Sequence, residues 1–551
     1  MSARRRVLVA VQILLYLVNE SQGLARIDPL VETELGLIKG LRANDGDYAM
    51  FLGIPFGKVN ASNPFGDATA YGKFDGVLEA YDDSAICPQI DEATGVYIGT
   101  IDCLHLNVYV PASATSKNPV PVMVYIYGGS FRHGDFGRHV YGPKFLVKHD
   151  VILVTLNYRL GPYGFMCLDI PEVPGNQGFK DQLLALKWVK EHIHNFGGDS
   201  NKITVSGESA GAIAVDFHLM YNKEKLFHKA IIQSGTTLSP VFYEPSRNAP
   251  ILIAEKLGYI TDDLNAAIAF LAQVDPSLVI AAVFDLGIEL NVRPCVEKSF
   301  EGVESFIDQN WITADVRNAR DVQVLIGFNE HERLIIHASG DDDYFRNLNV
   351  VETKLFDAFD VDNDKFNGMK DIVQHFYFGD DEVTIESKLD VVNFDSDIMY
   401  NHPSYRSIDR FIEHNSGDIF LYLFSYVGGR NYVRVRDNIT VGGAVHADEL
   451  GYLFDMSYLN IETHDADDVR MVDVMTTLWT NFVKYGNPTP EVTELIPVKW
   501  TPIVDTKTKP FLNLGKELTV GSRPFSERMA FWDLFYKANK ELQRAYPGEN
   551  I

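Results

Sequence analysis

Ser209 lies between two glycines in VSGESAGAIA (205–214), which places a hydroxyl where nucleophilic catalysis could begin. The stretch KITVS before it resembles a strand, and the small-residue run AIAVDFHLMY after it resembles a helix. A strand–turn–helix exposes such a serine at the end of a sheet, and Gly207 and Gly211 leave room for the adjacent elements. A turn serine needs no partners, whereas a nucleophile needs a base, an acid and an anion site.

Donors for a developing oxyanion are predicted at two places. Gly128 and Gly129 follow the apolar run PVMVYIY (residues 121–127), and consecutive glycines let backbone N–H groups turn toward an anion. Ala210, at the start of the predicted helix, would supply a further N–H group. A simple glycine turn is the alternative interpretation of Gly128 and Gly129.

The base and the acid must come later in the chain. His446, in GGAVHADELGYLF, follows a glycine-rich loop and is the best candidate base. Glu330 and Glu332 follow the strand-like run VQVLIGF, and the residues alone leave both open as the acid. A carboxylate would hold the imidazole in one tautomer while its other nitrogen takes the serine proton. The pattern predicts acyl transfer, and the sequence has no metal-binding, phosphate or dinucleotide motif that would indicate a metal or cofactor.

Short apolar runs alternate with helical patterns along the chain, which indicates an α/β fold with a large, mostly parallel sheet flanked by helices. The stretch 176–198 predicts a helix with one apolar face, closed by Gly197 and Gly198. Residues 240–320 and 340–415 are mixed and helix-leaning, and we expect them to be cap-like excursions from the sheet. The strand-like runs are 104–110, 121–127, 151–157, 202–207, 229–235, 322–328 and 418–424.

The first residues have the pattern of a signal peptide. Three arginines at 4–6 precede an apolar run of a dozen residues, with small and polar residues after it. We expect residues 1–23 to be removed and 24–551 to form one domain, secreted and without a stable membrane anchor. An uncleaved anchor is the alternative, but the apolar run is short for a bilayer span.

Charge and cysteine content bound the partners and the compartment. A net charge of −26 disfavours nucleic acid and anionic membranes as partners and leaves a small molecule as the expected one. Four cysteines fit an oxidising compartment; Cys87 and Cys103 would close a short loop, and Cys167 and Cys295 are expected to be buried free thiols. Glycosylation sequons, which require surface positions, begin at Asn60 and Asn438.

From GIPFG at 53 to FWDLFY at 531, the chain resembles the type-B carboxylesterase/cholinesterase family of α/β hydrolases, and most resembles secreted, moth-type insect carboxylesterases. The resemblance implies an α/β-hydrolase fold. The stretches that carry it are DCLHLNVYVP (102–111), NYRLGPYGF (157–165), GNQGFKDQLLALKWVKEHIHNFGGD (175–199), IIQSG (231–235), GGAVHADEL (442–450) and LWTNFVKYGNPTP (478–490).

Carried over by position, the resemblance implies roles for individual residues. It selects Glu332 over Glu330 as the acid, beside Ser209 as nucleophile and His446 as base. It also implies an oxyanion hole formed by Gly128, Gly129 and Ala210. Ser234 corresponds to a serine that supports the acid by hydrogen bonding, and Cys87–Cys103 corresponds to the first family disulfide.

The chain also departs from the family pattern. Tyr127 stands where histidine usually precedes the oxyanion glycines, and Arg333 stands where glycine usually follows the acid. Pro64 and Ile101 occupy the places of a buried Arg–Glu pair. The loop 88–102 contains no tryptophan, so the cation–π site that cholinesterases of this family use for quaternary ammonium is missing.

The sequence therefore predicts a serine carboxylesterase that hydrolyses esters to acid and alcohol through an acyl-enzyme, with volatile, dietary or xenobiotic esters as candidate substrates. The Gly-Glu-Ser turn differs from the Gly-Gln-Ser of typical juvenile hormone esterases and disfavours that specialised function. Three alternatives remain: a slow scavenger of esters or organophosphates, a non-catalytic esterase-like binding protein, and a lipase with a lid.

Overall fold

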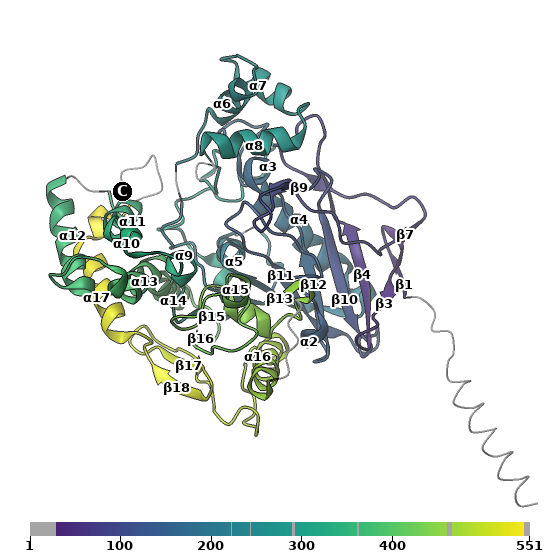
Figure 1. Cartoon of the computed structure of the whole chain (residues 1–551). Coiled ribbons are helices and arrows are strands. Elements are labelled where there is room, and N and C mark those ends of the chain that lie inside the picture. The colour runs from purple at the N-terminus through teal and green to yellow at the C-terminus, as the bar shows by residue number, and fades with distance from the viewer. Residues whose placement is uncertain are drawn as a thin grey trace, which may run out of the picture.

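An 11-stranded sheet forms the centre of the computed structural model, and helices cover both of its faces (Figure 1). The structure describes residues 29–544, except 222, 243, 289–291, 361–362 and 460–464. The signal peptide predicted at 1–23 lies outside the described residues.

All seven strand-like runs of the sequence belong to this sheet. The pairings from β12 through β11 and β13 to β17 are parallel, whereas β10, β4 and β3 at one edge and β18 at the other pair antiparallel. The predicted large, mostly parallel sheet is thus confirmed. In spatial order the strands are β18 (Leu518–Ser522), β17 (Pro510–Leu514), β16 (Ile419–Phe424), β15 (Gln323–Asn329), β14 (Lys229–Gln233), β13 (Gly198–Glu208), β11 (Val120–Ile126), β12 (Ile152–Leu156), β10 (His105–Pro111), β4 (Tyr48–Pro55) and β3 (Leu41–Arg42).

Helix α4 (Gln177–His192) forms where the apolar periodicity predicts it. Its apolar side chains except Leu184 are buried, and a 3-10 turn over Ile193–Phe196 continues it to Gly197. Gly197 has φ 81°, the left-handed conformation in which glycine commonly ends a helix. Helix α4 therefore stops where β13 must begin, and β13 leads directly to Ser209.

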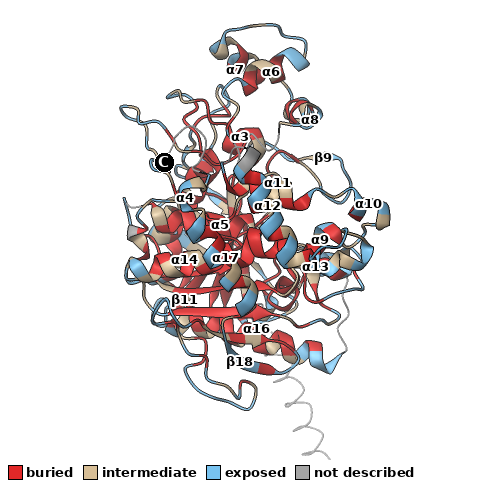
Figure 2. Cartoon of the chain, turned by 90° about the vertical axis from the view of Figure 1, so that its left-hand side faces the viewer, coloured by how far each residue is buried: buried red, intermediate tan, exposed pale blue. Residues whose placement is uncertain are grey.

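The first excursion from the sheet is a group of three helices, α6 (Ala249–Lys256), α7 (Leu264–Leu271) and α8 (Pro276–Leu286), that projects at the top of Figure 1. Its buried residues form an apolar cluster with residues 163–173, separate from the main core. Figure 2 shows buried residues concentrated in the sheet and the helices on it, while the outer side of this group is exposed.

The second excursion consists of short helices that follow β15. They begin directly after Arg333, the residue that follows Glu332, and they include Tyr400, whose ring packs on His446. In chain order they are α9 (Leu334–His337), α10 (Asp342–Arg346), α11 (Val350–Ala358), α12 (Asn363–Phe378), α13 (Lys388–Ser396), the π-helical turn Asp397–Asn401, and α14 (His402–Glu413).

Both cysteine pairs are disulfide-bonded. Cys87–Cys103 agrees with the sequence, but the expectation that Cys167 and Cys295 are free thiols is wrong, because these two residues are bonded to each other. They lie 128 residues apart and meet only because the chain returns to residues 163–173 after α8. A Cβ on Gly175 would lie 2.5 Å from the Cys295 sulfur, so glycine is required where the chain passes the disulfide.

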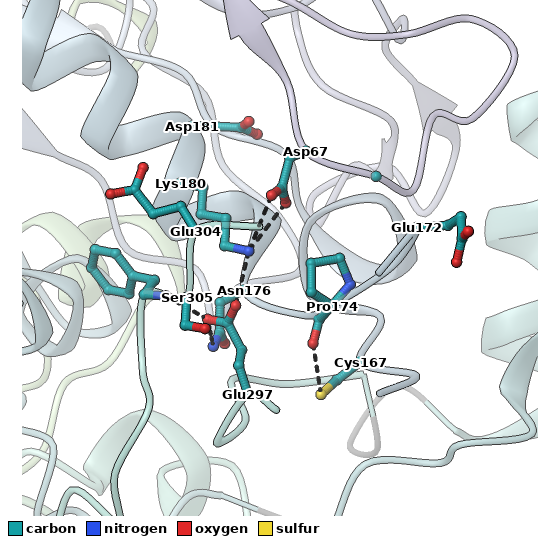
Figure 3. A network of polar contacts seen from close by, with 12 residues as sticks. Asp67, Cys167, Glu172, Pro174, Asn176, Lys180, Asp181, Glu297, Glu304 and Ser305 are labelled. Carbon is teal, nitrogen blue, oxygen red and sulfur yellow. Dashed lines mark hydrogen bonds and ion pairs between the residues drawn. The ribbon is translucent and has the colours of Figure 1, made fainter. Parts of the chain in front are cut away.

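Buried charges tie the returning chain to the main fold. Lys180 Nζ, from α4, lies 3.2 Å from Asp67 Oδ1 and 2.8 Å from Glu297 Oε2 (Figure 3). The other oxygen of Glu297 accepts a hydrogen bond of 2.8 Å from Asn176 Nδ2. A buried carboxylate stays charged only when paired in this way, so the network fixes the segment after α8 relative to α4.

A second buried pair joins Arg159 to Asp181, and both side chains are fully inaccessible to solvent. Arg159 also donates to the backbone carbonyl oxygens of Pro64 and Gly66 at 3.0 and 2.7 Å. Backbone carbonyl groups near Pro64 are thus held by a buried arginine, although Pro64 stands where the resemblance implies one residue of a buried Arg–Glu pair.

Both predicted glycosylation sequons lie on the surface, with exposed Asn60 and Asn438 side chains. Among the described residues, no helix combines the length and apolar character of a membrane span, and no cluster of three or more histidine, cysteine or acidic side chains could hold a metal ion.

The Cys167–Cys295 disulfide should stabilise the fold by restricting the unfolded chain. Changing both residues to alanine should lower the free energy of unfolding by about 2–5 kcal/mol, measured by urea denaturation. Mass spectrometry of denatured, unreduced wild-type protein after N-ethylmaleimide treatment should show no labelled cysteine. Labelling at Cys167 and Cys295 would contradict the assignment.

Candidate active site

Ser209 occupies a strained turn between β13 and α5 (Ala210–Met220), with φ 56° and ψ −124°. Such a conformation costs on the order of 1–3 kcal/mol for a residue with a side chain and persists only when the surroundings impose it. The Ser209 N–H donates to the Gln233 carbonyl at 2.9 Å, and its own carbonyl accepts from Ile213 N–H at 3.0 Å. The predicted strand–turn–helix is present, and its hydrogen bonds hold the serine at the end of the sheet.

Three glycines enclose this turn because side chains would collide with backbone. A Cβ on Gly211 would lie 2.1 Å from the Ile126 carbonyl oxygen, and one on Gly207 would lie 2.4 Å from the carbonyl carbon of Gly211. A Cβ on Gly235 would approach the Ser209 carbonyl oxygen to 2.5 Å. The local motif predicts Gly211 and Gly207, whereas Gly235 lies outside that motif, in the connection after β14.

The structure brings Glu332 and His446 together in the interior. His446 Nδ1 lies 2.6 Å from Glu332 Oε2, and the Glu332 side chain is fully buried. The other oxygen of Glu332 accepts a hydrogen bond of 2.7 Å from the backbone N–H of Asn329. Glu330 lies instead beside Gly443, where an added Cβ would be 2.0 Å from its carboxylate. Of the two glutamates left open by the residues, Glu332 is the one in contact with the imidazole.

Glu208, inside the Gly-Glu-Ser turn, is a site residue that sequence reasoning missed. Its Oε1 lies 3.2 Å from His446 Nε2 and makes no hydrogen bond to any residue that the structure describes. Among the residues that the structure describes, the Ser209 hydroxyl and the His446 ring are not hydrogen-bonded to each other. The imidazole therefore lies between two buried carboxylates, one at each ring nitrogen.

The groups around His446 determine the protonation of its imidazole. Burial lowers the pKa of His446, but Tyr400, Glu208 and Glu332 outweigh it and hold this pKa well above its ordinary value. Burial raises the pKa of Glu208 to about 8, against the opposing effect of His446. The Glu208–His446 pair thus titrates as a unit, and the pH at which the imidazole becomes a free base depends on both residues.

The predicted oxyanion residues line the turn beside Ser209. A Cβ on Gly128 would lie 3.0 Å from Ser209 Cβ, and the N–H groups of Gly128, Gly129 and Ala210 donate to no other described residue. The Ser130 N–H also donates to none of the described residues. Gly129 and Ser130 have φ of 101° and 56°, respectively. Successive left-handed residues form a concave row of N–H groups that suits an anion, so Ser130 joins the candidate donors.

Ser234 is buried, but its hydroxyl makes no hydrogen bond to the described residues. The bond to Glu332 that the resemblance implies is therefore not formed in this structure. The oxygen of Glu332 that does not face the imidazole is occupied by the Asn329 N–H. The backbone of Ser234 has φ 54° and donates to the Gly327 carbonyl at 2.9 Å, which ties the loop after β14 to β15.

A buried carboxylate holds the loop that carries His446. Glu449 accepts hydrogen bonds from Gln233 Nε2 at 2.9 Å and from Asn329 Nδ2 at 2.7 Å. Asn329 also donates to the Val445 carbonyl at 2.6 Å, next to His446. The ends of β14 and β15 are thus linked to the His446 loop, an arrangement that the sequence alone did not indicate.

The mixed sheet, the serine on a strained turn after β13 and the buried carboxylate–histidine pair beside it define the protein as an α/β hydrolase. A model of the carboxylesterase family matches residues 27–532, and the chain belongs to that family.

Its relatives are esterases and lipases. Esterase B1 of Culex pipiens is 28% identical over 534 residues, covering 93% of this chain and 98% of that protein. Juvenile hormone esterase of Heliothis virescens is 29% identical, and the match covers 83% of this chain and 85% of that protein. The crystal structure of juvenile hormone esterase from Manduca sexta, with OTFP covalently attached, superposes with a TM-score of 0.78 at 26% identity, over 93% of this chain and 100% of that one. The protein is therefore a carboxylic ester hydrolase.

The Glu208 carboxylate should influence the pH dependence of activity. Changing Glu208 to Gln removes a negative charge that favours the imidazolium, so the pKa of His446 should fall. The neutral base then forms at lower pH, and the acid limb of the kcat/KM profile should move down by about one pH unit. An unchanged limb would mean that Glu208 is uncharged throughout that pH range.

Proposed function

We propose that the protein is a serine carboxylesterase in which Ser209 is the nucleophile, His446 the base and Glu332 the acid. The observation that carries this assignment is the buried 2.6 Å contact between Glu332 and His446, beside the strained turn of Ser209. The order serine, acid and histidine along the chain supports it. So does the position of Ser209 and Glu332 just after the parallel strands β13 and β15, at the edge of the sheet to which the His446 loop is bonded.

The proposed reaction has two steps. Ser209 Oγ attacks the ester carbonyl while His446 Nε2 takes its proton, and the same nitrogen then protonates the departing alcohol. Water, deprotonated by His446, attacks the acyl-enzyme, releases the carboxylic acid and restores the serine. In both steps the N–H groups of Gly128, Gly129, Ser130 and Ala210 donate to the oxyanion, and each such donor contributes about 3 kcal/mol to lowering the barrier.

Glu332 acts through the imidazole. Its carboxylate accepts from Nδ1–H, which leaves Nε2 as the basic nitrogen, and it stabilises the imidazolium formed during each step. The Asn329 N–H holds the second oxygen of Glu332, so the carboxylate has a fixed orientation. Glu208 must turn from His446 Nε2 when Ser209 engages it, because both groups need the same nitrogen.

The mature chain is proposed to begin after residue 23 and to be secreted. The two disulfides and the exposed sequons at Asn60 and Asn438 support this location. Small neutral esters, whether volatile, dietary or xenobiotic, are the proposed substrates, since a chain with net charge −26 repels anions at long range.

Removing the Ser209 hydroxyl should abolish turnover of p-nitrophenyl esters. Ser209→Ala keeps the Cβ and hence the local backbone constraint, and kcat should fall by at least about 10⁵-fold. A series from acetate to octanoate would also size the acyl pocket. Equal inactivity of folded wild type and variant would favour a binding protein, and a burst of one alcohol per enzyme without further turnover would favour a scavenger.

Glu332 and Glu330 provide a matched pair of variants. Glu332→Gln should lower kcat by about 10³–10⁴-fold, because the amide can stabilise the wrong imidazole tautomer. Glu330→Gln, two residues away and outside the contact with His446, should leave kcat within about threefold of wild type. The reverse ranking in steady-state kinetics at pH 8 would assign the acid to Glu330.

A further inference from the structure

Arg333 immediately follows Glu332 and is a departure from the family pattern. Its guanidinium Nε donates to Asp395 Oδ2 at 2.8 Å, and its backbone N–H donates to Ser396 Oγ at 3.0 Å. Asp395 and Ser396 are the last two residues of α13, and both are buried. The residue after the acid is therefore attached through both side chain and backbone to the end of one helix.

Asp395 is itself held in place. His337 Nε2 lies 3.0 Å from the same carboxylate oxygen, and His337 Nδ1 lies 2.9 Å from the Tyr344 hydroxyl. Burial raises the pKa of Asp395, but Arg333 and then His337 outweigh it and keep this pKa below its usual range. The carboxylate is thus ionised and offers Arg333 a fixed partner.

The helix changes from α to π over Asp397–Asn401, directly after this attachment. π-helical turns inside α-helices are rare and occur frequently at functional sites. Tyr400, within the turn, packs on the imidazole of His446, with ring centroids 4.8 Å apart and planes inclined by 39°. Burial lowers the pKa of Arg333, but Asp395 and then Tyr400 outweigh it and raise this pKa above its ordinary value. The bonds from Arg333 to Asp395 and Ser396 fix the start of the turn that carries Tyr400.

We infer that Arg333 is a positioning residue that acts through Tyr400: it holds the Tyr400 ring against His446 and so fixes the imidazole from its face, while Glu332 fixes it from its edge. This inference rests on the proposed function, because it assigns a role toward the catalytic base. It also gives a physical reason for arginine at a position where the family usually has glycine.

The packing of the Tyr400 ring on His446 affects both the orientation and the charge of the imidazole. An aromatic face against an imidazolium favours the charged form, and a packed ring prevents the imidazole from rotating about its bond to the backbone. The groups that face His446 are Glu332 at Nδ1, Glu208 at Nε2 and Tyr400 on the ring. Of these, Tyr400 is the group carried by the turn that directly follows the helix end to which Arg333 is bonded.

The test is a double-mutant cycle of Arg333→Ala and Tyr400→Phe. Tyr400→Phe keeps the ring and removes only the hydroxyl, and each single variant should lower kcat by about fivefold to tenfold with KM within twofold. The double variant should be no slower than the slower single variant, because both changes remove one linkage. Tyr400→Leu, which removes the ring, should also move the acid limb of kcat/KM to lower pH.

Arg333→Lys keeps the charge that Asp395 requires and should recover part of kcat, which separates positioning from loss of folding. Arg346→Ala is the control and should leave kcat unchanged, since the ion pairs that Arg346 on α10 forms with Asp342 and Glu382 are exposed. Additive effects, or unchanged kcat in both single variants, would overturn the inference. If wild type is no faster than Ser209→Ala, the proposed function has failed instead.

Discussion

The backbone of Ser209 is the constraint on which the rest of the structure depends. A residue with a side chain stays at φ 56° and ψ −124° only if the surrounding elements leave no alternative. β13 ends there, α5 begins there, and neighbouring glycines allow β11 and the loop after β14 to approach the turn within van der Waals distance. This local geometry is possible because of the order of the strands in the sheet and the glycines at positions 207, 211 and 235.

Around the turn, the interior holds several ionisable groups, and their arrangement compensates for burial. Glu332 and Glu208 face the two nitrogens of His446, while Glu449 is saturated by amide donors from Gln233 and Asn329. Burial alone would neutralise such groups, so each charged one needs a partner. Electrostatics and position are therefore coupled, since moving one group changes the protonation of the next.

The connections between distant parts of the chain follow the same rule. The Cys167–Cys295 disulfide and the Lys180 network both fix the segment that returns after α8, and Arg333 attaches the acid loop to the end of α13. These contacts lie outside the serine motif, yet they determine where its neighbours stand. Such attachments hold the excursions of this chain in place around the central sheet.

The sequence by itself determined seven of the eleven sheet strands, helix α4, the turn at Ser209 and the His446 loop, because apolar periodicity and steric demands on glycine act within a few residues. It left Glu330 and Glu332 equivalent until family resemblance separated them, and it misjudged Cys167 and Cys295. It also gave no sign of Glu208, Glu449, Ser130 or Tyr400 as neighbours of the site. Only the tertiary structure decided these, because a contact between residues far apart in the chain depends on how whole elements pack, and no local pattern records that packing.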